Sequence, residues 1–187
     1  MSARLGIIVG LTLALLVPFA APAAAGSPAQ RYFTDVVLTD QDGRPVRLYS
    51  DLLKGKTVAI NSFHTTCTGA CPVLMAVFTR LQIAMGDRLG KDFYLLSFTV
   101  DPATDTPPRL KDYAQKLGAR AGWYFLTGSK PDVQLALRKV GQFVEEKEAH
   151  PNVLIVGNER TGLWKKAFGL APPDQIVRLV QGVSNDR

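Results

Sequence analysis

An α/β fold with a partly parallel sheet is predicted by three features of the sequence. Short apolar segments typical of strands alternate with segments whose apolar residues recur at helical spacing. A hairpin signal stands on each side of this alternating region, at Asp40–Gly43 and at Asn158–Gly162. The chain has 187 residues, of which 47% are hydrophobic, so it can build one core-bearing domain and is too apolar for a disordered protein.

The first predicted elements are a hairpin and a strand. Val36–Leu38 and Val46–Leu48 flank the turn Asp40–Gly43, whose Asp-Gly pair favours a tight hairpin turn. Val58–Phe63 comes next, and its composition predicts a strand that leads directly to the first of the two cysteines.

Helices and strands then alternate along the chain. From Pro72 to Met85 the apolar residues recur at helical spacing, and Phe93–Val100 is a nearly continuous apolar run typical of a strand buried on both faces. A second helix is predicted over Pro107–Leu117 with Thr106 as its cap, followed by a short strand at Tyr124–Leu126.

The remaining elements are a helix over Val133–Val140, a hairpin of Val153–Val156 with Leu163–Phe168, and an amphipathic helix over Ile176–Val183. The order is therefore ββ, then β-α-β-α-β-α, then ββα. The central β-α-β steps imply right-handed crossovers and parallel strands. This is the layout of a thioredoxin-like fold with an N-terminal hairpin and a C-terminal β-hairpin plus helix.

The N-terminus predicts export. A positive start at Arg4 precedes the apolar run Leu5–Phe19 and the small residues Ala20–Ala25, as in a secretory signal peptide cleaved near Gly26. The alternative is an uncleaved anchor, because the uncharged stretch is long enough to span a bilayer. Residues 1–25 are thus expected to be a signal peptide or N-terminal membrane anchor. Residues 26–187 are expected to form one exported domain, periplasmic or anchored facing the periplasm.

Composition limits the function classes. Lys and Arg number 22 against 16 Asp and Glu, a net charge of +6, but the basic residues are scattered and form no stripe for nucleic acid. The excess is expected to solvate the surface, with membrane contact only through an uncleaved N-terminus. Two cysteines exclude a disulfide-dense scaffold and a four-thiolate metal site within one chain.

The candidate chemistry lies in the segment Cys67-Thr-Gly-Ala-Cys71-Pro72. It joins the strand ending at Phe63 to the helix opened by Pro72, at the carboxyl end of the sheet, where α/β folds place their sites. The helix N-terminus is expected to lower the pKa of the thiols. Sulfurs at positions i and i+4 lie one helical turn apart, so they can form a disulfide or hold one metal ion.

Other candidate residues have two interpretations each. His150 is a surface residue of a charged loop or a third metal ligand. His64 is a solvent-near strand end, or a functional residue that tunes the thiolate pKa or binds the metal as an alternate ligand. Met75 is a core residue or a further soft sulfur. Asp101 and Asp105 stabilise the turn before Pro107 or contact the site or a docking partner. Zinc prefers four ligands, whereas Cu(I) accepts two thiolates and one imidazole.

Several segments together resemble the Sco/SenC family of copper-binding proteins, which take part in cytochrome c oxidase assembly. They are Phe63–Pro72 with its Cys-x-x-x-Cys-Pro motif, Val100–Pro107 with Asp-Pro-x-x-Asp-Thr-Pro, Phe125–Gly128, and the His150 loop before a strand and hairpin. The resemblance implies a thioredoxin-like fold with extra elements. It also implies copper, Cu(I) or Cu(II), held by Cys67, Cys71 and His150.

Three functions follow from these expectations. The first is a copper metallochaperone that delivers copper to an apoprotein, such as a cytochrome c oxidase subunit, after a thiol reductant protein has reduced Cys67 and Cys71. The second is a thiol-disulfide oxidoreductase that acts on cysteines of a copper apoprotein or another exported protein, so the question of enzyme activity stays open. The third is an inert structural disulfide.

Overall fold

The computed structural model describes residues 27–146 and 152–187. Its elements are α1 (Pro28–Phe33), β1 (Val37–Thr39), β2 (Pro45–Arg47), η1 (Leu48–Leu53), β3 (Thr57–Phe63), α2 (Cys71–Met85), η2 (Gly86–Arg88), β4 (Phe93–Thr99), α3 (Pro107–Lys116), β5 (Trp123–Leu126), α4 (Lys130–Lys139), β6 (Val153–Asn158), β7 (Leu163–Phe168) and α5 (Pro173–Ser184). The predicted order of strands and helices is confirmed.

The central sheet has five strands in the order β5-β4-β3-β6-β7. β3, β4 and β5 run parallel, and β6 and β7 are each antiparallel to their neighbours. The parallel part comes from the two β-α-β steps, and the antiparallel part from the C-terminal hairpin. The fold is the predicted mixed α/β, thioredoxin-like fold.

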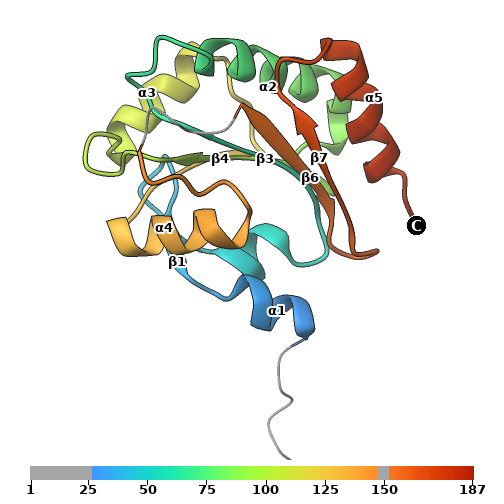
Figure 1. Cartoon of the computed structure of the whole chain (residues 1–187), viewed down its shortest axis with the longest axis horizontal. Helices are drawn as coiled ribbons and strands as arrows, with labels where there is room; N and C mark the ends of the chain where they lie inside the picture. Colours follow the sequence, from blue (N-terminus) through green and yellow to red (C-terminus); the bar gives the residue numbers. More distant parts are fainter. Residues whose placement is uncertain (1–26, 147–151) are drawn as a thin grey trace, which may run out of the picture.

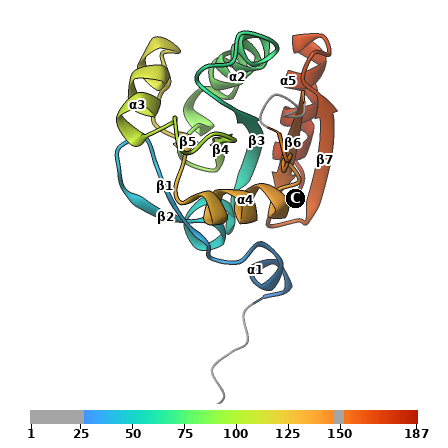
Figure 2. The ribbon, with the colours of Figure 1, turned by 60° about the vertical axis from the view of Figure 1, so that its left-hand side comes forward.

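Two helical layers cover the sheet, as Figures 1 and 2 show: α2, α3 and α5 on one face, and α4 with α1 on the other. Each layer seals its own core. Side chains of β3 alternate between the two, because Ala59 and Phe63 pack under α2 while Val58 and Ile60 pack under α4. All residues of β3 are buried.

The N-terminal hairpin β1-β2 forms a separate two-stranded sheet. The Asp40 carboxylate accepts hydrogen bonds from the backbone N–H groups of Asp42 and Arg44, both at 2.9 Å, and so fixes the predicted turn. Thr39 and Thr127 exchange backbone hydrogen bonds of 2.8 and 2.9 Å, which attach the hairpin to the segment after β5.

The structure differs from the sequence-based prediction in three details. Helix α1 and the π-helical turn η1 were not predicted. Helix α2 begins at Cys71, so the second cysteine belongs to the helix itself. Thr106 stands at the N-cap of α3 as predicted, but its side chain makes no capping hydrogen bond.

Within residues 27–146 and 152–187, the helices are all too short or too polar to cross a membrane. The predicted signal peptide or anchor, residues 1–25, lies outside the described residues.

Candidate functional site

The two cysteines lie where β3 gives way to α2. β3 ends at Phe63, and the Cys67 N–H donates to the carbonyl of His64 at 3.1 Å, which closes a turn after the strand. Cys71 is the first residue of α2, and Pro72 occupies its first turn, where a missing N–H costs no helical hydrogen bond. The site therefore stands at the carboxyl end of β3 and the N-terminus of a 15-residue helix.

The two thiols are not equivalent. Cys71 is 1% exposed whereas Cys67 is half-buried, and no disulfide joins them. Burial raises the pKa of Cys71 to about 12, helped by a hydrogen bond with the Cys67 side chain. The expectation that the helix N-terminus lowers the thiol pKa is therefore wrong for Cys71, because loss of solvent outweighs the helix dipole.

Asp105 holds the segment that leads to the cysteines. Its carboxylate is 0% exposed and accepts hydrogen bonds from Thr65 N at 3.2 Å and from Thr65 Oγ1 and Thr99 Oγ1 at 2.5 Å. Arg109 Nε lies 3.9 Å from the same carboxylate and donates to Thr65 Oγ1 at 2.6 Å. Asp105 thus joins the turn before α3 to the segment that leads to Cys67, in line with its predicted structural role, whereas contact with a metal or a docking partner stays a prediction.

The nearby His64 is buried rather than near solvent, with 7% of its surface exposed. Its Nδ1 is hydrogen-bonded to Thr66 Oγ1 at 2.9 Å, within the segment between β3 and Cys67. The interpretation of His64 as a solvent-near strand end is therefore wrong, because the ring is held within the turn that joins β3 to Cys67.

Met75 belongs to the core. It is 0% exposed, and its sulfur accepts a hydrogen bond from Asn61 Nδ2 at 3.7 Å. Asn61 Oδ1 in turn accepts from Ser97 Oγ at 2.7 Å, and Ser97 Oγ accepts from Trp123 Nε1 at 3.0 Å. This buried chain of hydrogen bonds supports the core interpretation of Met75 over its use as a soft metal ligand.

Tyr113 of α3 is a residue of the site that the sequence analysis did not single out. Its ring stacks on Phe63 with centroids 5.5 Å apart, and burial raises the pKa of its hydroxyl to about 12, with further contributions from Cys71, Cys67 and Asp105. The phenol therefore lies close to both thiols. Its helical spacing is that of a core residue, so nothing in the sequence distinguished it.

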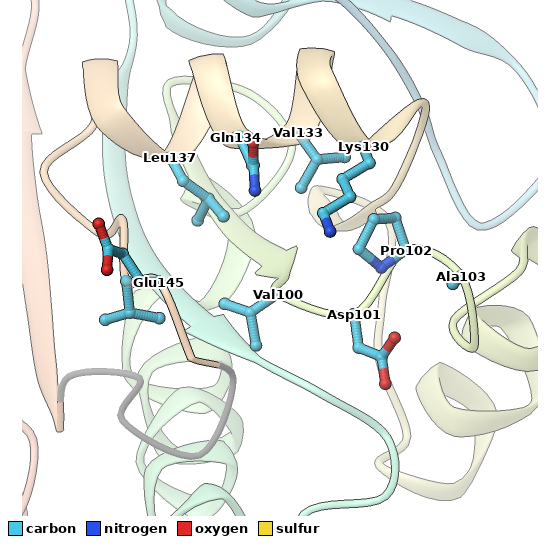
Figure 3. Close-up of a pocket in the computed structure, with 10 residues that line it drawn as sticks. Val100, Asp101, Pro102, Ala103, Lys130, Val133, Gln134, Leu137 and Glu145 are labelled. Atoms are coloured by element: carbon cyan, nitrogen blue, oxygen red, sulfur yellow. The ribbon is translucent and has the colours of Figure 1, made fainter.

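Asp101 lines a pocket under α4, on the other face of the sheet from α2. The pocket has a volume of about 240 Å³ and lies between α4 and the segment Val100–Ala103. Figure 3 shows Leu137 and Val133 of α4 pointing towards Val100, with Glu145 at one end. The Asp101 carbonyl accepts from Asp105 N at 2.9 Å, so its backbone closes the predicted turn, and Figure 3 shows its carboxylate pointing away from α4.

His150, the third predicted ligand, lies outside the described residues. In the part of the chain that the structure covers, no group of three or more His, Cys, Asp and Glu side chains could hold a metal ion. The structure thus brings Cys67 and Cys71 together and leaves the third ligand untested.

Comparisons with known proteins agree with the fold. The SCO1/SenC family model matches residues 24–161. A SCO1 protein homolog of Bacillus subtilis is 31% identical over 150 residues, which cover 78% of this chain and 72% of that protein.

Solved structures are similar over most of the chain. BsSco, described as a Sco-family cytochrome c oxidase assembly protein with a disulfide switch, is 28% identical with a TM-score of 0.67, covering 83% of this chain and 94% of its own. A SCO1/SenC family lipoprotein of Bacillus anthracis is 28% identical with a TM-score of 0.66, covering 80% and 92%. Copper-bound yeast Sco1 shares the fold at 21% identity and a TM-score of 0.67, covering 87% and 97%. The chain belongs to the SCO1/SenC family and is homologous to the Sco cytochrome c oxidase assembly proteins.

Proposed function

We propose that this protein binds one copper ion, Cu(I) or Cu(II), through Cys67, Cys71 and His150, and delivers it to a copper apoprotein such as a cytochrome c oxidase subunit. The observation that carries the proposal is the pair of hydrogen-bonded thiols at the start of α2, in a chain of the SCO1/SenC family. Two thiolates one turn apart suit a soft ion, and one imidazole completes a three-coordinate site for Cu(I).

The sheet topology supports His150 as the third ligand. β6 is antiparallel to β3, with Ile60 opposite Ile155, so the chain enters β6 at the same end of the sheet at which β3 leaves for the cysteines. His150 precedes β6, which begins at Val153. A ligand on the chain just before β6 therefore needs only a short path to the thiols.

The test is an anaerobic Cu(I) titration of the reduced protein. Wild type is expected to bind one equivalent, and Cys67→Ser, Cys71→Ser and His150→Ala are each expected to bind more weakly. His64→Ala is the matched control, because it removes the other histidine of the chain. Unchanged stoichiometry and affinity in His150→Ala would remove His150 from the ligand set, and loss of copper in His64→Ala alone would replace it by His64.

A thiol-disulfide oxidoreductase is the second candidate, and the unequal burial of the two cysteines favours it. The Cys67 thiolate would attack a disulfide of an exported protein and form a mixed disulfide, releasing one partner thiolate. Cys71 would then attack Cys67 sulfur and release the second partner thiolate, so the partner gains two electrons and the Cys67–Cys71 pair is oxidised. A thiol reductant protein would restore the pair.

This second candidate predicts that Cys71→Ser traps a mixed disulfide through Cys67, whereas Cys67→Ser traps little, because Cys71 is buried. Non-reducing electrophoresis of exported protein extracts measures the trapped species. Equal trapping by both variants, or none, would count against this role. In both functions residues 1–25, as a signal peptide or anchor, would direct the site to the periplasm.

A further inference from the structure

The start of α1 is fixed to the body of the domain. Ser27 is the N-cap of α1, and its Oγ is hydrogen-bonded to Tyr49 Oη at 3.0 Å. Tyr49 is buried in η1, and its hydroxyl donates to the Glu159 carboxylate at 2.9 Å. These bonds tie α1 to η1 and to the turn that follows β6.

This fixed point follows the proposed anchor closely. Only Gly26 separates Ser27 from residues 1–25, whose uncharged stretch is long enough to span a bilayer. Two residues of fully extended chain reach about 7 Å. When residues 1–25 cross a bilayer, so short a connection holds α1 against the lipid headgroups, and the surface around α1 is the part of the domain that meets them.

An apolar groove lies in the surface around α1. Its volume is about 480 Å³, and it runs between α1, the end of α4 and strands β6 and β7. Figures 1 and 2 show α1 as the outermost helix on this side of the molecule, beyond α4. Tyr32 lines the groove with 56% of its surface exposed. The lining also includes Phe33, Lys139, Val140, Ile155 and Trp164.

The charge of the groove is positive. Lys139 Nζ lies 5.1 Å from the centroid of the Tyr32 ring, and Arg31 stands in the last turn of α1. Among the described residues, no Asp or Glu lines the groove. Tyr and Trp rings favour the headgroup level of a bilayer, and cations beside them are attracted to anionic lipid. The groove therefore complements an anionic lipid surface, whereas two copies packed groove to groove would oppose like charges.

We propose that this groove is a membrane-contact surface, in which anionic phospholipid headgroups and the first carbons of their acyl chains contact Tyr32, Lys139 and Trp164. The inference rests on the anchoring role proposed for residues 1–25 and does not depend on copper.

Membrane contact through the groove also sets the orientation of the cysteine site. Phe33 and Trp164 belong to the core on the α1 and α4 face of the sheet, whereas Cys67 and Cys71 belong to the core under α2 on the other face. Figure 1 shows α1 and α2 on opposite sides of the sheet. A domain that rests on the groove therefore turns its cysteines away from the bilayer, towards an exported partner protein.

The test uses the full chain in lipid nanodiscs of phosphatidylglycerol and a phosphatidylcholine brominated in its acyl chains. Bromine quenches tryptophan only on close approach, and each of the two tryptophans of the chain can be observed alone. Trp123→Phe leaves Trp164 in the groove, and Trp164→Phe leaves Trp123, which is 1% exposed in the other core. We expect the brominated lipid to quench Trp164 and not Trp123. Absent quenching of Trp164, or equal quenching of both, would overturn the proposal.

A charge variant in the Trp123→Phe background tests the preference for anionic lipid. Lys139→Gln is expected to lower the ratio of docked to undocked protein about fivefold, the usual effect of one cation at an anionic surface. Lys116→Gln is the matched control, because Lys116 is an exposed residue of α3 in the opposite layer. Quenching is also expected to fall at high salt and in discs of phosphatidylcholine alone. Equal quenching in the two kinds of disc, or the same loss in Lys116→Gln, would overturn the choice of anionic lipid.

An apolar variant tests the groove itself. Tyr32→Ala is expected to reduce the quenching of Trp164, whereas Ile83→Ala, which changes a 69% exposed residue of α2 on the far face, is expected to leave it unchanged. Crosslinking of two copies through the groove in place of quenching would assign the groove to a second copy and overturn the proposal. A full chain that fails to enter the discs would overturn it together with the anchor. The copper titration needs no lipid, so it tests the proposed function separately.

Discussion

At the scale of single residues, the two cysteines of the site differ in their exposure to solvent. Cys67 is half-buried and stands in the segment before the helix, whereas Cys71 is buried under it. A reagent or a partner protein therefore meets Cys67 first. Copper must displace the proton of Cys71 to use it as a ligand, so copper binding is expected to release protons and to weaken at low pH.

Thiol alkylation tests this contrast. Because burial raises the pKa of Cys71 to about 12, this thiol is expected to stay protonated at pH 8. Iodoacetamide is expected to modify Cys67 first, and the Cys71 rate to rise about tenfold for each pH unit from 8 to 11. Peptide mass spectrometry measures both rates. The urea-unfolded protein is the control and should lose the difference, whereas equal rates in the folded protein would contradict the assignment.

Asp105 offers a second test at this scale. Asp105→Asn keeps the size of the side chain but replaces one acceptor oxygen by an N–H₂ group that faces the donors of Thr65 and Thr99. The loss is expected to be about 2 kcal/mol in the free energy of unfolding, because charge-assisted bonds to a buried carboxylate are lost. Urea unfolding measures it.

The control for Asp105→Asn is Asp112→Asn, because Asp112 is an exposed residue of the following helix α3 and its change should have little effect. The rate of Cys67 alkylation is also expected to change in Asp105→Asn. Asp105 holds Thr65, and Thr65 stands two residues before Cys67. Equal stability of Asp105→Asn and wild type would show that the Thr65 and Thr99 contacts contribute nothing.

The cysteine pair was predictable from sequence because its spacing, the following proline and the strand–helix junction all indicate a site. The residues that surround the cysteine segment could not be predicted in the same way. Thr65 and Tyr113 are ordinary residue types for a loop and a helix face, and their roles arise from contacts between distant segments such as Thr65 with Asp105. No local pattern carries that information.

At the scale of elements, prediction succeeded where periodicity was strong. The strands and the helices from α2 to α5 follow apolar patterns, and their bounds differ by only a few residues from those expected. Helix α1 has six residues, too few for a helical period to be recognised. The turn η1 follows β2 directly and has four buried residues, Leu48, Tyr49, Leu52 and Leu53. Only Leu48 belongs to the predicted strand Val46–Leu48, and the other three were assigned to no element.

The β6-β7 hairpin depends on one glycine. Gly157 stands opposite Trp164, and a Cβ at position 157 would lie 2.1 Å from the Trp164 ring. Trp164 also packs on Phe33 of α1, with centroids 5.2 Å apart. The Gly157 position therefore determines how closely the indole can lie on the sheet.

Gly157→Ala is expected to displace Trp164 and to lower the free energy of unfolding by about 2 kcal/mol, the usual cost of overpacking. Tryptophan fluorescence should shift to longer wavelength, and urea unfolding measures the stability. Gly182→Ala is the matched control, because a Cβ there meets nothing within 4 Å in helix α5. It should leave stability equal or slightly higher. A wild-type spectrum and stability in Gly157→Ala would show that Trp164 does not need this contact.

At the scale of the whole molecule, one sheet serves two cores. Leu95 and Phe125 face the core under α2, α3 and α5, whereas Leu96 and Leu126 face the core under α4 and α1. Neighbouring residues of one strand thus belong to opposite cores. Neither layer can leave without exposing an apolar face of the shared sheet, so residues 27–187 are expected to unfold as one unit.

The two tryptophans allow this to be tested, because each reports on a different layer. Trp123 is 1% exposed in the core under α2, and Trp164 packs against the core under α4 and α1. Trp164→Phe and Trp123→Phe each leave a single fluorophore, since the chain has two tryptophans. In each variant the fluorescence and far-UV circular dichroism transitions in urea are expected to share one midpoint, although the two variants can differ in stability from each other. A fluorescence transition in Trp123→Phe that precedes the loss of secondary structure would mean that the layer of α1 and α4 opens separately from the layer that holds the cysteines.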